Sequence, residues 1–99
     1  MTKFAEIQTE DRRLVILRLL AESSGYRAAS PLLQSALEGF GHVVSADRLI
    51  ADLDWLYEQQ LVSIESVGGI TLAVLTQRGL DVGQGRAHCT GVKRPMPGE

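Results

Sequence analysis

Cysteine and histidine are scarce in this chain: its 99 residues include one cysteine and two histidines. Cys89 has no second cysteine with which to form a disulfide, which agrees with a reducing compartment such as the cytoplasm. Together with His42 and His88 it makes three soft ligands, too few and too scattered in sequence for a thiolate and imidazole metal site. We therefore predict no bound metal.

Long hydrophobic runs are also lacking. The apolar run at residues 14–21 is interrupted by Arg18 and is far shorter than the ~20 residues that cross a bilayer. Acidic residues precede this run, and no small-residue cleavage site follows it, which argues against a signal peptide. We expect neither a membrane span nor a secretion signal.

Residues that perform catalysis do not occur in a recognisable pattern. The serine pair at 23–24 has no histidine base nearby, and the His-Cys pair at 88–89 lies in a glycine-rich segment without an orienting acid. The glycines at 39–41 and 83–85 do not match a phosphate-binding fingerprint. We predict a protein that is not an enzyme and that uses no cofactor.

An excess of positive charge is missing as well, because ten basic residues face twelve acidic ones for a formal net charge of −2. Such a chain has no global attraction to a polyanion. The balance is uneven: residues 1–60 hold six basic and nine acidic side chains, whereas residues 61–99 hold four and three. Any basic surface would therefore come mainly from the second part.

The first helix is predicted to begin near Thr9, a suitable N-cap, and to end near residues 23–25. Apolar residues occupy nearly every side of it, whereas a surface helix needs only one apolar stripe. We therefore expect one side to pack on the domain core and another on a second copy of the chain. The residues expected at this homodimer interface are Leu14, Val15, Ile16 and Leu19.

Two further helices follow. Ser30 is the expected cap of the second, with Pro31 at its first helical position, and Ser45 is the expected cap of the third. Apolar residues at helical spacing define the side of each helix that faces the core. The expected core residues are Leu32, Leu33, Ala36 and Leu37 in the second helix and Leu49, Ile50, Leu53, Leu56 and Tyr57 in the third.

A β-hairpin is predicted next. Alternation in residues 62–65 and again in residues 70–74 has the period of two strands, and Gly68 and Gly69 between them tolerate the positive φ of a tight turn. Thr76 is expected to cap a last short helix. The predicted fold is α+β: a winged helix-turn-helix of three helices and a two-stranded wing in residues 1–83, followed by an extended basic tail in residues 84–99.

The whole chain resembles a family of small proteins encoded by Mu-like phages and prophages, whose members are often labelled ArsR-type regulators. The likeness is carried by these segments: DRRLVILRLL at 11–20, DWLYEQQLV at 54–62, LTQRGLDV at 75–82, GR at 85–86 and GVKRP at 91–95. The resemblance implies a winged helix of phage or prophage origin acting in the cytoplasm of a bacterial host. ArsR-type metal sensing is disfavoured, because the grouped ligands that it needs are missing.

A winged helix usually binds duplex DNA with the helix before the hairpin in the major groove. The side of the third helix opposite its leucines would then face the bases. The candidates for reading base edges are Ser45, Asp47, Ala51 and Asp52. The candidates for phosphate contacts are Arg48, Arg78, Arg86, Lys93 and Arg94. The preferred hypothesis is a transcriptional regulator.

Charge supports an alternative, a phage adaptor that keeps the fold and binds a protein. Arg48 is the one basic residue on the expected groove-facing side, and the wing tip at 66–69 has neither lysine nor arginine. Trp55 is either part of the core or an exposed anchor for such a partner. The tail is a phosphate-binding arm, a strap docked on the domain or on a second subunit, or a disordered terminus.

Overall fold

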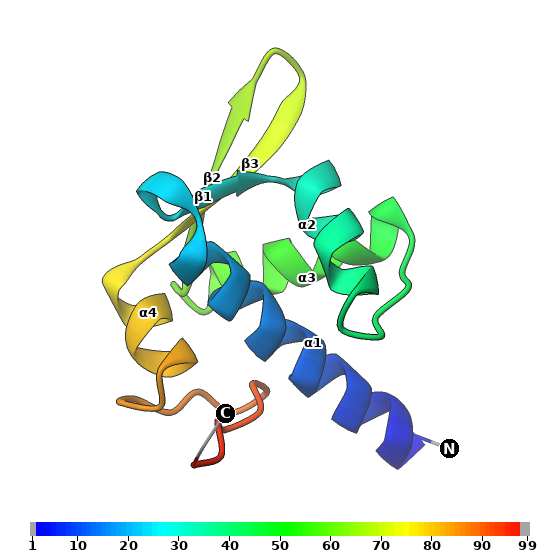
Figure 1. The fold of residues 1–99 in the computed structure, drawn as a ribbon, viewed down its shortest axis with the longest axis vertical. Helices are drawn as coiled ribbons and strands as arrows, with labels where there is room; N and C mark the ends of the chain where they lie inside the picture. The colour runs from blue at the N-terminus through cyan, green and yellow to red at the C-terminus, as the bar shows by residue number, and fades with distance from the viewer. Residues whose placement is uncertain (1, 98–99) are drawn as a thin grey trace.

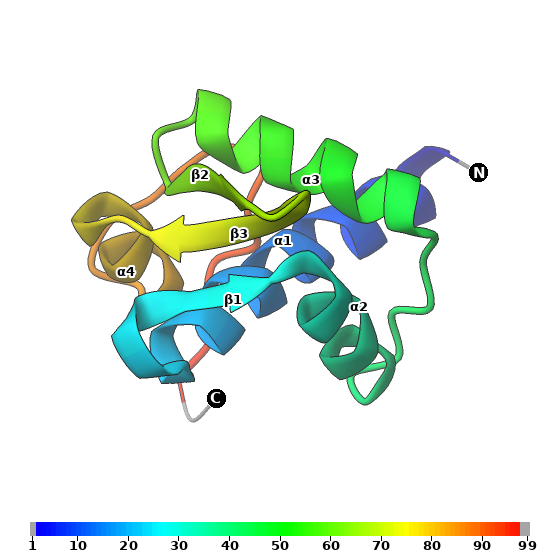
Figure 2. The ribbon, with the colours of Figure 1, turned by 90° about the horizontal axis from the view of Figure 1, so that it is seen from above.

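The computed structural model describes residues 2–97, and this part of the chain folds into four α-helices and a three-stranded antiparallel sheet (Figures 1 and 2). The elements are α1 (Thr2–Glu22), the 3-10 turn η1 (Ser24–Tyr26), β1 (Arg27–Ala29), α2 (Ser30–Glu38), α3 (Ala46–Glu58), β2 (Val62–Val67), β3 (Ile70–Leu75) and α4 (Gln77–Gly83). This order is that of a winged helix, so the predicted fold class is confirmed, with one strand more than expected.

The wing is the β2–β3 hairpin, which projects from the body of the domain (Figure 1). Its register pairs Val62 with Leu75 and Val67 with Ile70. Gly68 and Gly69 form the turn with φ of 56° and 80°, as the sequence predicted. The unexpected third strand, β1, pairs with the base of β3 in the sheet order β1-β3-β2. Three residues are too few to show the alternation of a strand, so no pattern in the sequence predicts β1.

The phase of β3 differs from the expected alternation. Ala73 and Leu75 face the core with Val62, whereas Ile70 at the tip is half exposed. The strand reads ITLAVL and is apolar in both phases, so its own sequence does not tell which side is buried. The outer face of the sheet therefore keeps aliphatic side chains, over which Arg27 of β1 reaches Glu65 of β2 at 2.5 Å.

Helix α1 runs through the middle of the molecule (Figure 1). It begins at Thr2, not near Thr9, and contacts α2, β3 and α4. The expected homodimer interface is wrong for Leu14, Val15 and Ile16, which are 1%, 7% and 0% exposed within the monomer, and Leu19 also packs on the core. The apolar surplus of α1 is explained by the many elements of its own domain that cover it.

Local signals set the ends of the later helices. The Ser45 hydroxyl caps α3 by accepting the N–H of Arg48 at 3.1 Å, as predicted. In α2 the N-cap is Ala29, one residue before the predicted Ser30. The leucines that form the cores of α2 and α3 are Leu33, Leu37, Leu49, Leu53 and Leu56. The expectation is wrong for Leu32 and Tyr57, which lie at the edges of their stripes and are mostly exposed.

Candidate nucleic-acid interface

The outermost stripe of α3 is acidic. Since the leucines occupy one side of this helix, the residues at i, i+4, i+7 and i+11 on the opposite side are Asp47, Ala51, Asp54 and Glu58, and all four are exposed. Ser45 and Arg48, at the start of the helix, are exposed too. The predicted exposure of Asp47, Ala51 and Arg48 therefore agrees with the structure. Three of the four residues along the middle of this exposed side, however, are carboxylates.

Asp52 does not belong to this surface. It is 3% exposed, and its carboxylate accepts hydrogen bonds from Arg12 Nε at 2.5 Å and from the Arg12 Nη2 atom at 3.1 Å. The prediction that Asp52 faces a DNA groove is therefore wrong, because this carboxylate is the buried partner of an equally buried arginine. The two residues are 40 positions apart, so no local pattern announces the pair.

Two of the five predicted phosphate contacts are already engaged with carboxylates. The Arg86 guanidinium lies 2.9 Å from Asp81 Oδ1, and Lys93 Nζ lies 3.4 Å from Asp11 Oδ1. Arg48, Arg78 and Arg94 are exposed and form no ion pair within the described residues, although Arg78 Nε donates to the backbone carbonyl of Gln59 at 3.2 Å. Two of the five predicted phosphate contacts are thus paired with carboxylates of the same chain, and the other three are accessible to a ligand.

The pairing of Arg86 has a measurable consequence. Hydrogen bonds from Arg86 and then from Gln77 hold the pKa of Asp81 below its usual value. We expect the Arg86→Ala variant to raise the pKa of Asp81 toward that value, as followed by NMR titration of its carboxyl carbon. The wild-type contact favours folding above the unfolded pKa of Asp81 and is lost as pH falls through the folded one. An unchanged Asp81 titration in the variant would show that the pair does not persist in solution.

Trp55 lies on the flank of α3 between its acidic stripe and its leucines. Its ring is half-buried against the core, with the guanidinium carbon of Arg13 3.7 Å from the ring centroid. A Cβ on Gly91 would lie 2.6 Å from the ring, so the tail passes directly over it. The core interpretation of Trp55 is thus the better one, with the tail as an additional cover. Burial lowers the pKa of Arg13.

The tail follows α1 and binds to it through the backbone. The Gly91 carbonyl accepts a hydrogen bond from Arg13 at 2.9 Å, and the Lys93 N–H donates to the Glu10 carbonyl at 3.1 Å. Val92 is 3% exposed beneath these contacts. Among the open alternatives, the described tail is a strap on its own domain, whereas residues 98–99 of the predicted tail lie outside the described residues.

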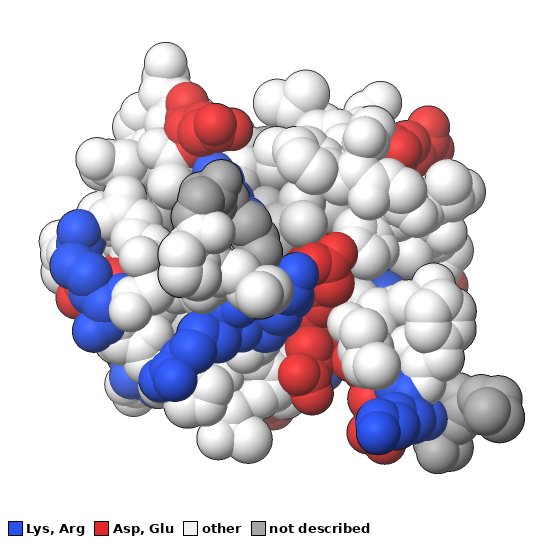
Figure 3. Space-filling model, turned by 60° about the horizontal axis from the view of Figure 1, so that its bottom comes forward, with Lys and Arg blue, Asp and Glu red and all other residues white. Residues whose placement is uncertain are grey.

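Charge on the lower face of the molecule is mixed. Figure 3 shows lysine and arginine beside aspartate and glutamate, without a broad surface of one sign. The wing tip is uncharged and apolar, since Val67 and Ile70 are each about half exposed on either side of Gly68 and Gly69. On this face and at the wing tip, the described residues therefore offer DNA a few separate cations and no extended basic surface.

Two other kinds of site are absent from the described residues. Within residues 2–97, no three histidine, cysteine, aspartate or glutamate side chains are grouped closely enough to hold a metal ion. No described helix has the length and apolar character needed to span a membrane.

The amino-acid sequence is similar to those of two known proteins. A scan against protein-family profiles gives no match. The chain is 50% identical over 92 residues to the uncharacterized protein gp26 of Escherichia phage Mu, covering 93% of this chain and 95% of that protein. The chain belongs to the gp26 family of phage Mu. An uncharacterized protein of Haemophilus influenzae (strain ATCC 51907 / DSM 11121 / KW20 / Rd) is 42% identical over 78 residues, covering 78% and 76%.

Solved structures show the same fold in RosR proteins. Structures of hsRosR-S1 and hsRosR-S4, each described as a complex, match with TM-scores of 0.61 and 0.62 at 27% identity over 70% of this chain. The chain spans 61% and 59% of those two proteins. The phage relationship and the winged helix are thus shown, whereas an ArsR classification is not.

Proposed function

We propose that this gp26 relative is a DNA-binding protein of a Mu-like phage or prophage and regulates transcription in the cytoplasm of the bacterial host. The support is architectural: α3 and the hairpin are arranged as in winged helices, which usually bind DNA, and the structural neighbours are RosR proteins with the same fold. The observation that carries the proposal on this chain's own residues is the pair of accessible arginines at the two ends of α3.

Arg48 lies in the first turn of α3, and Arg78 is held against the carbonyl of Gln59 just beyond its last turn. Arg48 and Gln59 share one flank of the helix, and at 1.5 Å per residue they are about 16 Å apart along its axis. The major groove is about 12 Å wide, so arginines at this separation can contact phosphates on its two sides. The two cations therefore act as phosphate contacts around α3.

The acidic stripe would then face base edges. A carboxylate accepts a hydrogen bond from cytosine N4 but repels phosphate, so Asp47 contributes to sequence selection and not to general affinity. Ala51, next along the stripe, allows close approach to the groove floor. With few cations, binding is expected to be modest and its salt dependence shallow, because the slope of affinity against salt grows with the number of phosphate contacts.

The test is a fluorescence-anisotropy titration with phage-derived and random duplexes at several salt concentrations. We expect saturable binding that favours phage DNA. Arg48→Ala and Arg78→Ala should each weaken binding to all duplexes and reduce the salt slope by about 0.9, the value for one lost phosphate contact. Arg27→Ala is the matched control, since this exposed arginine is already paired with Glu65 and should leave the slope unchanged.

One observation favours a second function. Three exposed carboxylates on α3 and an uncharged wing tip suit a basic protein partner better than a nucleic acid. If no duplex binds even at low salt, where electrostatic attraction is strongest, DNA binding is refuted and the phage adaptor becomes the better proposal.

A further inference from the structure

Exposed apolar side chains lie at the tip of the wing. Val67 is 57% exposed and Ile70 is 50% exposed. The two residues form a cross-strand pair, so their side chains are neighbours on one face of the hairpin. Gly68 and Gly69 lie between them, and a Cβ built on either glycine would meet no atom within 4 Å. The wing thus ends in a bare turn flanked by two β-branched side chains.

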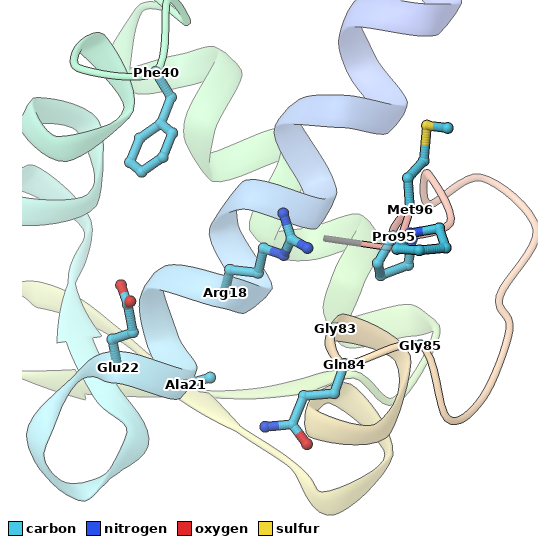
Figure 4. Close-up of a pocket in the computed structure, with 10 residues that line it drawn as sticks. Arg18, Ala21, Glu22, Phe40, Gly83, Gln84, Gly85, Pro95 and Met96 are labelled. Carbon is cyan, nitrogen blue, oxygen red and sulfur yellow. The ribbon is translucent and has the colours of Figure 1, made fainter. Parts of the chain in front are cut away.

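This tip differs from a second group of exposed apolar side chains, which lies beside α1. Phe40 and Met96 are found there, on two sides of a hollow of about 700 Å³ (Figure 4). Arg18 and Glu22 of α1 also line the hollow. That surface is concave and carries charges of both signs, whereas the wing projects from the domain (Figure 1). The shape of the wing tip suits insertion into a groove of another molecule.

The wing offers no cation to phosphates. Residues 62–75 contain one charged side chain, Glu65, which is paired with Arg27 at 2.5 Å. Exposed apolar side chains are stabilised where water is excluded, by about 25 cal/mol per Å² of buried surface. In a duplex, the stacked bases offer such a surface, and apolar side chains of minor-groove proteins insert between them. The composition of the tip therefore favours contact with bases over contact with the phosphate backbone.

The hairpin follows α3 directly, with an accessible arginine beside the junction. Strand β2 begins at Val62, shortly after Gln59, whose carbonyl accepts the hydrogen bond from Arg78 Nε at 3.2 Å. Arg78 is proposed above to contact a phosphate beside the major groove, so the hairpin begins next to the backbone that separates this groove from the minor groove. At about 3.3 Å per residue, β2 extends about 17 Å from Val62 to Val67. The wing tip is thus long enough to reach the adjacent minor groove.

We propose that Ile70, supported by Val67, is an apolar wedge that enters the minor groove and kinks the duplex. The inference rests on the DNA-binding function proposed above. Proteins that bind the minor groove often insert isoleucine or another apolar side chain between base steps, which unstacks the bases and bends the DNA by about 20–90°. Pyrimidine–purine steps such as TA unstack easily, so a wedge selects them without a hydrogen bond to a base. The wing therefore reads the deformability of the duplex, while α3 reads base edges.

The experiment combines fluorescence anisotropy with energy transfer between dyes at the two ends of a duplex. The probes are a phage-derived duplex of about 30 base pairs and two duplexes of the same length, one of alternating TA and one of alternating GC sequence. We expect the wild type to bend the bound phage duplex and to bind the TA duplex more tightly than the GC duplex.

Ile70→Ser should weaken binding about tenfold, as expected for the loss of one buried isoleucine side chain. It should also reduce the bend and the preference for TA over GC. The slope of affinity against salt should stay unchanged, because no phosphate contact is lost. Ile70→Leu, which keeps an apolar side chain of similar volume, should retain the bend.

The matched control is Ile7→Ser. Ile7 is 54% exposed, close to the 50% of Ile70, and lies at the end of α1 that is far from the wing (Figure 1). This variant should bind and bend DNA as the wild type does, and circular dichroism checks that both serine variants fold. Binding without a bend, or equal behaviour of Ile70→Ser and Ile7→Ser, would overturn the wedge and leave DNA binding intact. No anisotropy change with any duplex would overturn DNA binding and the wedge together, so the two failures are distinguishable.

Discussion

Asp52→Asn is expected to lower the free energy of unfolding by about 3 kcal/mol or more, the usual cost of removing one partner from a buried ion pair. Arg12 is 6% exposed and Asp52 is 3% exposed, and the carboxylate accepts both hydrogen bonds from this guanidinium. An amide in its place has no charge, so Arg12 would keep a buried charge without compensation. Urea unfolding of the wild type and the variant measures the loss in free energy of unfolding, provided that the two proteins have the same m-value.

The matched control is Asp54→Asn. Asp54 lies two residues further along α3 and is exposed, so this substitution should change the free energy of unfolding by no more than about 0.5 kcal/mol. The double variant Arg12→Met, Asp52→Leu removes both charges and should be far less destabilised than Asp52→Asn alone, because apolar residues of similar volume often replace a buried pair without loss. If Asp52→Asn matched Asp54→Asn in stability, the pair would not hold α1 against α3.

The parts of this fold that the sequence predicted are encoded over a few residues. A serine or threonine cap acts on an N–H three residues away, and the leucine stripe of α3 repeats within two turns. The Gly68-Gly69 turn is equally local. The features that the sequence did not predict lack such local signals. Strand β1 forms because it pairs with β3, which is distant in sequence. Residues 3–8 are helical although neither an N-cap nor a core contact in this segment predicts a helix.

The candidate site divides in the same way. Helical spacing was enough to place Asp47, Ala51 and Arg48 on the accessible side of α3. Helical spacing could not distinguish Asp52 from these residues, because its carboxylate lies at the edge of the stripe and forms an ion pair with Arg12 of α1. Nor could composition show that Arg86 is engaged by Asp81, which is five residues away on the preceding helix. Charge counting therefore overestimates the basic surface available to DNA.

The Leu-Thr-x-x-Gly sequence at residues 75–79 brings α4 close to the end of α3. Thr76 caps α4 by accepting the N–H of Gly79 at 2.9 Å, and its hydroxyl donates to the Gln60 carbonyl at 2.8 Å. The Thr76 N–H donates to the carbonyl of Leu61 at 3.1 Å. These bonds hold Gly79 so near to Leu61 that a Cβ on it would lie 2.0 Å from the Leu61 carbonyl oxygen.

Gly79→Ala should therefore destabilise the domain by about 3 kcal/mol, at the upper end of what overpacking costs, because the atom that it meets is backbone and cannot rotate away. The control is Gly39→Ala, where φ is −65° and the added Cβ lies 3.4 Å from its nearest neighbour, so that stability should change by less than about 0.5 kcal/mol. Urea unfolding compares the two variants. Equal stability would mean that α4 moves away without loss, and the close α3–α4 contact would then not explain the glycine.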